Sequence, residues 1–415
     1  MTTGGLSPDG TVLVVGASLA GWRAVETLRA EGFHGAITLV GEELHLPYDR
    51  PPLSKQVLAG TWPPEKAVLA DRKRSSELRV HEVLVHRAVR LDVEARQVEI
   101  DDGTFLTGDA LVLATGAAPR QLPGTEGLGH RDGLFTLRTL DDSIALQAAL
   151  AAVESCRVIV IGAGFIGAEV ASTCAGLGCR VTVVEAMEIP LSNVLGPLIG
   201  THCGSLHAAH GIDLRTGVGV AGIRRLEGRN GLEVELDGGD VLEADVVVVG
   251  IGVAPAVSWL EGSGLTVDNG LVCDDRLFAA DGIVAAGDMA RWVWRHDGAE
   301  ELIRIEHWQI AAEAGVAAAR SVLAGRSDAL PFAPIPYFWS DQFGIRFQVL
   351  GNPGGRDDVE IVDGSFEEGK FVALFGRAGR LRAVMAIGRP RKLMGYRPLL
   401  ESGSSWDVAL AHEST

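Results

Sequence analysis

Two short apolar runs, each followed by a glycine-rich turn and then a helical pattern, stand out along the chain. The first run covers residues 12–15 and the second covers residues 158–161, and both are rich in β-branched side chains. Such runs favour strands, and a strand that leads through a tight turn into a helix is typical of a β-α-β unit. We therefore predict one β-α-β unit that begins at residue 11 and a second that covers residues 157–185.

Each predicted unit is followed by the same order of elements. Residues 79–106 and residues 223–242 alternate between apolar and polar positions, which predicts antiparallel strands. Each stretch then leads into an apolar run that ends in glycine, at residues 111–116 and 246–252. This repeated order predicts two related dinucleotide-binding domains, one inserted in the other.

From about residue 331 the composition becomes more aromatic, with alternating β patterns, which predicts a smaller α+β domain. The predicted fold class is α/β, with two Rossmann-like domains in a glutathione-reductase-like arrangement and a C-terminal domain. The predicted boundaries are residues 1–118 and 245–328 for the first dinucleotide-binding domain, 119–244 for the inserted one and 329–415 for the C-terminal domain.

The second glycine turn has the full spacing of a dinucleotide-binding motif, with Gly162, Gly164 and Gly167. The first glycine of such a motif permits the tight turn, the second lets the backbone approach a pyrophosphate, and the third lets the helix pack on the strand. The following strand ends at Glu185, and no arginine occurs in the next three residues. A carboxylate at this position accepts hydrogen bonds from a free ribose diol and repels a 2′-phosphate, which favours NADH over NADPH.

The first glycine turn keeps Gly16 and Gly21 but has Ser18 at the middle position. The Ser18 side chain narrows the approach to a phosphate, although its hydroxyl can donate a hydrogen bond to one. We assign this turn to a second dinucleotide because a Gly287-Asp288 pair follows a late apolar run. Two dinucleotide sites in one chain indicate a flavin that accepts hydride from a pyridine nucleotide.

The cysteines and the net charge narrow the possible functions. Five cysteines form no Cys-x-x-Cys pair, and none precedes Cys156, which indicates reduced thiols in a cytoplasmic protein. A thiol relay after the first β-α-β unit is therefore excluded, so electrons leave a flavin singly or pass to a small oxidant. The net charge of −17 argues against affinity for nucleic acid or anionic membranes. The sequence shows neither a signal peptide nor an apolar run near the ~20 residues that span a bilayer.

Seven sequence blocks occur in an order that resembles one known family. The blocks are Gly16-Ala-Ser-Leu-Ala-Gly21, Pro47-Tyr-Asp-Arg-Pro-Pro-Leu-Ser-Lys55, Ala114-Thr-Gly-Ala-Ala-Pro-Arg120, Leu137-Arg-Thr-Leu-Asp-Asp142, Ala286-Gly-Asp288, Arg304-Ile-Glu-His-Trp308 and Tyr337-Phe-Trp-Ser-Asp-Gln342. Together they resemble the oxygenase-coupled NADH-dependent ferredoxin reductases, the group of putidaredoxin reductase and biphenyl dioxygenase reductase. The resemblance implies hydride transfer from NADH to FAD, then single-electron transfer to a two-iron two-sulfur ferredoxin that serves a monooxygenase or a ring-hydroxylating dioxygenase.

The resemblance also implies roles for individual residues. At the FAD pyrophosphate it implies Gly16, Ser18, Ala20 and Gly21, with Glu42 at the adenosine ribose and Ala88 near the adenine. It also implies Arg50 and Lys55 toward the flavin, Arg138 as an FAD contact, Asp288 at the ribityl chain and Trp308 beside the isoalloxazine. For NADH it implies Gly162, Gly164, Ile166, Gly167 and Glu185, with Gly252 at the nicotinamide half. Lys55 and Glu169 are the candidate catalytic pair, implied to meet beside flavin N5, where a lysine would stabilise the anionic reduced flavin.

Several alternatives stay open at this point. The same scaffold also suits a rubredoxin or small-oxidant reductase, or an NADH-sensing flavoprotein of the apoptosis-inducing-factor type. The basic residues Arg389, Arg391, Lys392 and Arg397, with Arg72, Lys73 and Arg74, either help to dock an acidic ferredoxin or are merely solvated. His202, Cys203, His207 and His210 have helical spacing, and we interpret them as a polar helix face and predict no metal. Trp292 and Trp294 are interpreted as a strand edge or a partner surface, and the oligomeric state, monomer or dimer, stays open.

Overall fold

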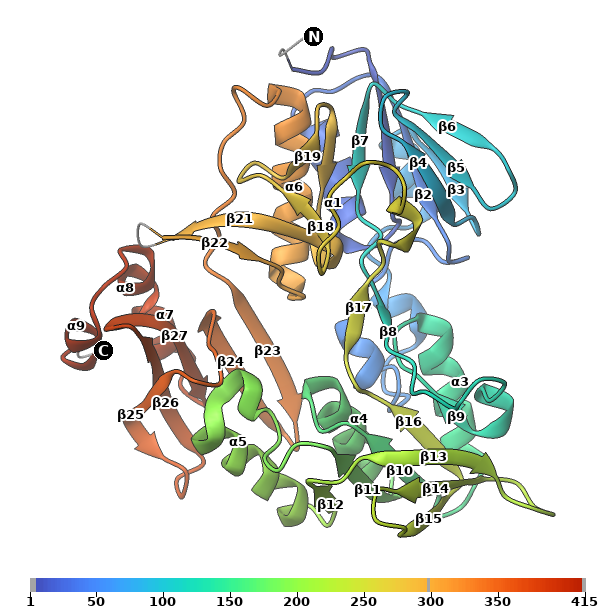
Figure 1. Cartoon of the computed structure of the whole chain (residues 1–415), viewed down its shortest axis with the longest axis vertical. Coiled ribbons are helices and arrows are strands. Elements are labelled where there is room, and N and C mark those ends of the chain that lie inside the picture. Colours follow the sequence, from blue (N-terminus) through green and yellow to red (C-terminus); the bar gives the residue numbers. More distant parts are fainter. Residues whose placement is uncertain (1–4, 297–298, 413–415) are drawn as a thin grey trace. The chain divides into compact units, whose positions relative to one another are not determined.

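A computed structural model describes residues 5–296 and 299–412 of the chain (Figure 1). The chain divides into two compact units, which are described separately. The first unit contains the chain up to residue 49, residues 68–118 and residues 254–336. The second unit contains residues 50–67, residues 119–253 and the chain from residue 337 onward. The insertion of one dinucleotide-binding domain in the other is thus confirmed, while the domain boundaries given above stay predictions.

A six-stranded sheet forms the centre of the first unit, in the order β19-β20-β7-β1-β2-β3. Its strands are β1 (Thr11–Val15), β2 (Ala36–Gly41), β3 (Val80–Leu84), β7 (Ala110–Leu113), β19 (Phe278–Ala280) and β20 (Ile283–Ala285). Only β19 runs antiparallel to its neighbour. The middle strands are buried on both faces, which explains their unbroken apolar sequences.

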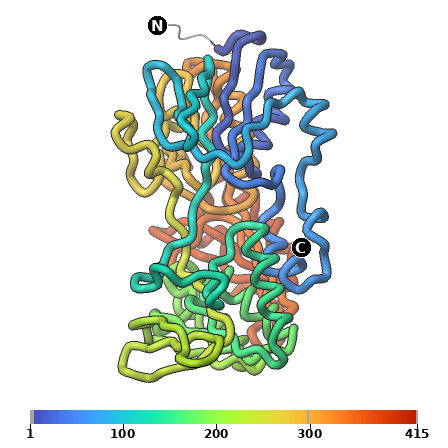
Figure 2. The backbone as a smooth tube through the Cα atoms, turned by 90° about the vertical axis from the view of Figure 1, so that its right-hand side faces the viewer, coloured from blue at the N-terminus to red at the C-terminus, as the bar shows by residue number. Residues whose placement is uncertain are grey.

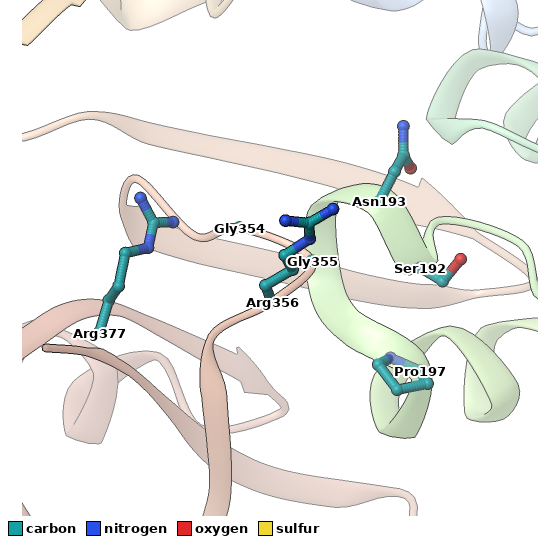
Figure 3. Close-up of a pocket in the computed structure, with 7 residues that line it drawn as sticks. All are labelled: Ser192, Asn193, Pro197, Gly354, Gly355, Arg356 and Arg377. Atoms are coloured by element: carbon teal, nitrogen blue, oxygen red, sulfur yellow. The ribbon is translucent and has the colours of Figure 1, made fainter.

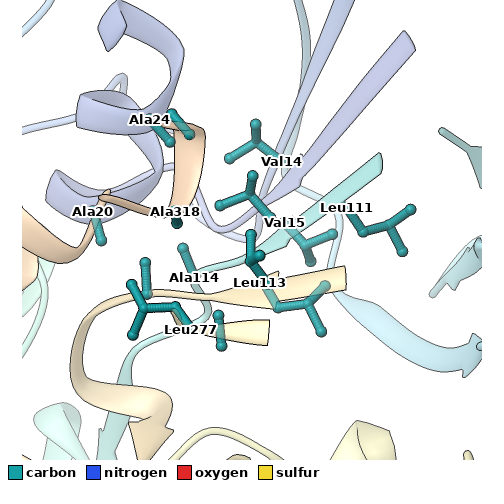
Figure 4. Close-up of a cluster of buried hydrophobic side chains, with 14 of the residues drawn as sticks. Val14, Val15, Ala20, Ala24, Leu111, Leu113, Ala114, Leu277 and Ala318 are labelled. Carbon is teal, nitrogen blue, oxygen red and sulfur yellow. The ribbon is translucent and has the colours of Figure 1, made fainter. Parts of the chain in front are cut away.

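Helices α1 (Leu19–Ala30) and α6 (Trp308–Ala324) pack side by side in the first unit, although they are almost 300 positions apart in the chain (Figures 1 and 2). Small side chains make this close packing possible, as the cluster around Ala20, Ala24 and Ala318 shows (Figure 4). Gly315 of α6 also lies against the backbone of Ala20. The start of α1 is therefore held between the sheet and α6.

The remaining strands of the first unit form two small sheets. They are β4 (Ala88–Asp92), β5 (Gln97–Ile100) and β6 (Phe105–Thr107) in one sheet and β18 (Leu271–Cys273), β21 (Ala290–His296) and β22 (Ala299–Ile303) in the other, and helix α2 (Arg72–Glu77) precedes β3. The prediction of antiparallel strands over residues 79–106 is confirmed for β4 to β6 but wrong for β3. As an edge strand of the parallel sheet, β3 is only partly buried and so shows a similar alternation.

Trp292 and Trp294 lie on β21 and are buried, so their interpretation as an exposed edge or partner surface is wrong. Their indole Nε1 groups donate hydrogen bonds to the carbonyl oxygens of Phe332, at 3.2 Å, and Pro334, at 3.1 Å. Alternation along a strand does not reveal what covers it, and here a later segment of the chain covers both rings.

A five-stranded parallel sheet forms the centre of the second unit, in the order β12-β11-β10-β16-β9. Its strands are β9 (Leu134–Phe135), β10 (Arg157–Ile161), β11 (Arg180–Glu185), β12 (Asp213–Thr216) and β16 (Val246–Val249), accompanied by helices α3 (Leu140–Ala151), α4 (Phe165–Gly176) and α5 (Ser192–Ala209). The predicted antiparallel strands over 223–242 are confirmed as β13 (Val220–Arg225), β14 (Leu232–Leu236) and β15 (Val241–Ala244). Short strands β8 (Ala117–Pro119) and β17 (Val253–Pro255) pair where the chain leaves and re-enters the first unit.

The C-terminal part of the second unit is an antiparallel sheet in the order β23-β24-β27-β26-β25. Its elements are β23 (Tyr337–Gln342), β24 (Ile345–Gly351), β25 (Asp358–Ser365), β26 (Lys370–Arg377), β27 (Arg380–Ile387), α7 (Pro390–Gly395), α8 (Arg397–Glu401) and α9 (Trp406–Leu410). One face of this sheet packs on α5, where Leu195, Ile199 and Cys203 join a common apolar core. The predicted α/β fold with a C-terminal α+β domain is thereby confirmed. No helix in residues 5–296 and 299–412 is long and apolar enough to cross a membrane.

Candidate functional site

The glycine turn of the second unit joins β10 to α4, and its three glycines meet different constraints. Gly162 has a φ of +100°, and a Cβ there would lie 2.4 Å from the carbonyl oxygen of Gly250. A Cβ on Gly167 would lie 2.0 Å from the carbonyl oxygen of Gly162. A Cβ on Gly164 would meet no protein atom within 4 Å. The fold itself therefore requires the first and third glycines, while the open space at Gly164 is what a bound pyrophosphate needs.

Glu185 ends β11 beside this turn, and its carboxylate is nearly buried. One oxygen accepts a hydrogen bond from the amide of Ala163 at 2.7 Å, and the other accepts one from the amide of Met187 at 2.8 Å. The acid is thus held in one orientation at the carboxyl end of the sheet, where α/β proteins bind nucleotides. Ile166, in the first turn of α4, leaves 50% of its surface exposed. Gly252 has a positive φ, and its carbonyl accepts a hydrogen bond from the amide of Arg120 at 3.0 Å.

The glycine turn of the first unit has the same geometry at its two glycines. Gly16 has a φ of +123°, with a Cβ position 2.1 Å from the carbonyl oxygen of Ala114. A Cβ on Gly21 would lie 2.0 Å from the carbonyl oxygen of Gly16. Ser18 stands at the N-cap of α1, but its side chain donates or accepts no capping hydrogen bond. Its hydroxyl is therefore not committed to the helix.

Two segments from the later part of the chain contact earlier residues of the first unit. A Cβ on Gly287 would lie 3.1 Å from the Cβ of Ala20, which places the short turn with Asp288 beside the glycine turn. The indole Nε1 of Trp308, the first residue of α6, donates a hydrogen bond to Asp49 Oδ1 at 2.7 Å. Burial raises the pKa of Asp49, while the hydrogen bond from Trp308 opposes that rise. No local sequence pattern singles out Asp49, because nothing in the chain shows that residues 49 and 308 meet.

Lys55 and Glu169 form an ion pair within the second unit. Lys55 follows a 3-10 turn over Pro51–Ser54, and the two prolines at its start are compatible with that turn. The Lys55 Nζ lies 2.7 Å from Glu169 Oε2, and the side chains are 13% and 3% exposed. The structure thus brings the candidate pair together, while its catalytic role stays a prediction.

Glu169 has three further hydrogen-bond donors that the sequence analysis missed. Ser54 Oγ donates to Oε2 at 2.6 Å, Ser340 Oγ donates to Oε1 at 2.7 Å, and the amide of Asp341 donates to Oε1 at 3.1 Å. Ser54 and Ser340 are separated from Glu169 by 115 and 171 positions, respectively. A local pattern cannot reveal such contacts, although both serines lie in the blocks that carry the family resemblance.

The other predicted contact residues are divided between the two units. Arg50 donates a hydrogen bond to the carbonyl of Arg138, just before the capping box that starts α3. Glu42 is exposed at the end of β2, and Ala88 is buried in the apolar core. The first unit contains Gly16, Ser18, Ala20, Gly21, Glu42, Ala88, Asp288 and Trp308, and the second contains Arg50, Lys55, Arg138, Gly162, Gly164, Ile166, Gly167, Glu169, Glu185 and Gly252. Their contacts with ligands stay predictions.

The basic cluster near the C-terminus is largely compensated by acids. Asp363 pairs with both Arg389 and Lys392, and Arg397 pairs with Glu401. Arg72 and Arg74 likewise pair with Glu82 and Glu77. Arg391 is exposed and has no ion pair in the part of the chain that the structure describes. Most of the cluster's positive charge is therefore compensated by neighbouring acids.

The histidine-rich face of α5 packs against aromatic rings. His202 stacks on Phe366 with ring centroids 4.6 Å apart, and His210 stacks on Phe343 at the same distance. His207 is buried, so the face is less polar than the sequence indicated. No group of three His, Cys, Asp or Glu side chains among residues 5–296 and 299–412 could hold a metal ion.

A cavity of about 720 Å³ lies between the start of α5 and the loop before β25 (Figure 3). Ser192, Asn193 and Pro197 line it on one side, and Gly354, Gly355, Arg356 and Arg377 line it on the other. Arg377 pairs with Asp357, a residue of the same loop, with Nε 2.5 Å from Oδ1. The cavity contains none of the predicted site residues.

Comparisons with known proteins agree with this geometry. The family described as pyridine nucleotide-disulphide oxidoreductase matches residues 10–315, and the reductase C-terminal family matches residues 337–415. Rhodocoxin reductase of Rhodococcus erythropolis is 37% identical, over 94% of this chain and 89% of that protein. The anthranilate 1,2-dioxygenase system ferredoxin–NAD(+) reductase component of Burkholderia cepacia is 37% identical, over 95% of each chain.

Among solved structures, the covalent putidaredoxin reductase–putidaredoxin complex is similar, with a TM-score of 0.90 and 31% identity. The match covers 98% of this chain and 96% of that one. Because the family matches extend over most of the sequence and both relatives are similar along nearly their whole length, the chain belongs to the pyridine nucleotide-disulphide oxidoreductase family and carries its reductase C-terminal domain.

Proposed function

We propose that this protein is an FAD-dependent NADH:ferredoxin oxidoreductase. It takes hydride from NADH onto FAD and passes single electrons to a two-iron two-sulfur ferredoxin, which in turn serves a monooxygenase or a ring-hydroxylating dioxygenase. The observation that carries the proposal is the combination of two dinucleotide turns with a proline-rich segment that ends in Lys55 and contains no cysteine. Relatives named as ferredoxin–NAD(+) reductase components support the same partner class.

The residues of each unit fit the dinucleotide assigned to it, FAD in the first unit and NADH in the second. In the first unit, the uncommitted hydroxyl of Ser18 and the amides at the start of α1 suit the FAD pyrophosphate, with Asp288 close by. In the second unit, the open space at Gly164 and the oriented carboxylate of Glu185 suit NADH. Because that carboxylate would repel a 2′-phosphate, NADH is the proposed donor rather than NADPH.

When bound, FAD supplies the chemistry that converts one hydride into two single electrons. The chain's contribution is to bind and orient the two cofactors and to place charge beside the reacting ring. Lys55 and Glu169 are proposed to supply that charge, with Glu169 holding the ammonium of Lys55 in place. We also propose a cytoplasmic location, because all five cysteines are free thiols.

An absorbance spectrum and an anaerobic titration test the proposal directly. The purified protein is expected to be yellow, and NADH is expected to bleach the flavin at far lower concentration than NADPH. Reduction of cytochrome c should then depend on an added two-iron two-sulfur ferredoxin. A colourless protein that cannot be reconstituted with FAD would refute the cofactor assignment.

The choice of acceptor separates the remaining candidates. Cytochrome c reduction through a rubredoxin instead of a ferredoxin would indicate a rubredoxin reductase. Rapid oxidation of NADH by a small oxidant alone would indicate an oxidoreductase without a protein partner. A long-lived flavin–nicotinamide complex with negligible turnover would indicate an NADH-sensing flavoprotein.

A further inference from the structure

The two oxygens of the buried Glu169 carboxylate face different segments of the second unit. Oε2 accepts hydrogen bonds from Lys55 Nζ at 2.7 Å and from Ser54 Oγ at 2.6 Å. Oε1 accepts hydrogen bonds from Ser340 Oγ at 2.7 Å and from the amide of Asp341 at 3.1 Å. Glu169 on α4 is therefore held at one oxygen by Ser54 and Lys55 and at the other by strand β23.

The direction of the hydrogen bonds around Ser340 follows from its single hydroxyl proton. Gln342 Nε2 donates to Ser340 Oγ at 3.0 Å, so the hydroxyl accepts there and its own proton points to Glu169. Ser340 and Gln342 are each only 1% exposed. The order of donation is thus Gln342 to Ser340 to Glu169, in surroundings with little water to replace any member.

The orientation of the Gln342 amide in this arrangement has an energetic cost. Its Oε1 is buried and has no hydrogen-bond partner within residues 5–296 and 299–412. A buried carbonyl oxygen without a donor is costly, and such groups call for an explanation. Turning the amide over would put the carbonyl against Ser340, whose proton is already given to Glu169, so the observed orientation is the one that keeps Ser340 aimed at the carboxylate.

Strand β23 is also fastened to α4 next to this point. The amide of Phe343 donates a hydrogen bond to Ser172 Oγ at 2.8 Å, one turn of α4 beyond Glu169. In Figure 1, β23 runs alongside α4, in agreement with the contacts between these two elements. Ser340 therefore approaches Glu169 from a backbone that is itself fixed.

We propose that Ser340, supported by Gln342, is a positioning residue for hydride transfer. It holds the Glu169 carboxylate in one rotamer, so that the ammonium of Lys55 stays at one place instead of following a rotating acid. The inference rests on the proposed function, because Lys55 matters here only if its charge acts on the flavin. It assigns to the C-terminal sheet a role in the reduction of the flavin by NADH, in addition to any role in the fold.

The test is the anaerobic, stopped-flow reduction of the FAD-loaded protein by NADH. Ser340→Ala is expected to lower the limiting rate of flavin reduction by about tenfold, the effect of losing one hydrogen bond to a charged group, with the NADH dissociation constant unchanged. Ser340→Thr keeps the hydroxyl and is expected to recover most of the rate. Gln342→Met removes the supporting donor and is expected to give a smaller loss of the same kind.

Two comparisons separate positioning from a merely structural role. Ser321→Ala in α6 removes another buried serine whose hydroxyl donates a hydrogen bond, here to the carbonyl of Arg276 at 2.9 Å, and should leave the limiting rate unchanged. In a Lys55→Met background, Ser340→Ala should cause no further loss of rate, because the side chain that it positions is absent.

Each result decides the question. A wild-type limiting rate in Ser340→Ala, or an equal further loss in the Lys55→Met background, would overturn the inference and leave the proposed function intact. If Ser340→Ala does not fold, a wild-type rate in Gln342→Met overturns it in the same way. Failure of NADH to reduce the flavin of the wild-type protein would instead refute the proposed function itself.

Discussion

Two positions of the glycine turn in the second unit, Gly164 and Gly167, predict different effects for the same small change. Adding one methyl group at Gly164 places it in open space, whereas adding it at Gly167 places it 2.0 Å from the carbonyl oxygen of Gly162. Gly164 has a φ of −71° and a ψ of −178°, which alanine adopts without strain. Gly164→Ala should therefore weaken NADH binding, and Gly167→Ala should lower the stability of the fold.

The magnitudes follow from these contacts. Because Cβ atoms hardly ever come within 3.0 Å of such an oxygen, Gly167→Ala forces α4 or its turn to move by about 1 Å, and overpacking of this kind costs about 1–3 kcal/mol. Gly164→Ala should change the free energy of unfolding by less than about 0.5 kcal/mol. A methyl group against a pyrophosphate should weaken NADH binding by about 1–3 kcal/mol, or about 10- to 200-fold.

Thermal unfolding of the FAD-loaded protein and the NADH dependence of flavin reduction measure the two effects separately. Gly176→Ala is the matched control, because Gly176 lies in the same helix with open space around it. It should keep NADH affinity and gain up to about 1 kcal/mol of stability from helix propensity. A stable Gly164→Ala variant with wild-type affinity for NADH would refute the placement of the pyrophosphate, and a fully stable Gly167→Ala variant would refute the packing argument.

Three further predictions concern charge. Glu185→Gln removes the repulsion of a 2′-phosphate and should shift the kcat/KM ratio toward NADPH by about tenfold, or about 1.4 kcal/mol; an unchanged ratio would contradict this. Burial raises the pKa of Asp49, so the folded protein binds that proton more tightly than the unfolded chain does, and stability falls as pH rises above about 4. Asp49→Asn keeps an acceptor for Trp308 and should raise Tm at pH 8, with a difference that disappears below pH 4. Arg391→Glu should weaken ferredoxin affinity at low salt more than Arg397→Glu, since Arg397 is already paired with an acid; equal effects would remove Arg391 from the docking surface.

Local patterns predicted the repeated architecture because each pattern reports a nearby physical constraint. The apolar runs that became β1 and β10 are central strands buried on both faces, and such strands need no polar positions. The glycine turns were recognisable because a positive φ and a close helix contact exclude other residues at fixed spacing. Edge strand β3 shows where this reasoning ends, since partial burial produces the same alternation in a parallel strand as in an antiparallel one.

The sequence by itself determined the two dinucleotide-binding domains, the α/β class and the absence of cysteine before Cys156, because these follow from residues close together in the chain. Only the tertiary structure decided how Glu169 is held, that Asp49 binds the indole of Trp308, and that Trp292 and Trp294 are buried. Each of these depends on side chains that are tens to hundreds of positions apart. A hydrogen bond of under 3 Å between such residues depends on how whole elements pack, and the local periodicity of the sequence does not predict that packing.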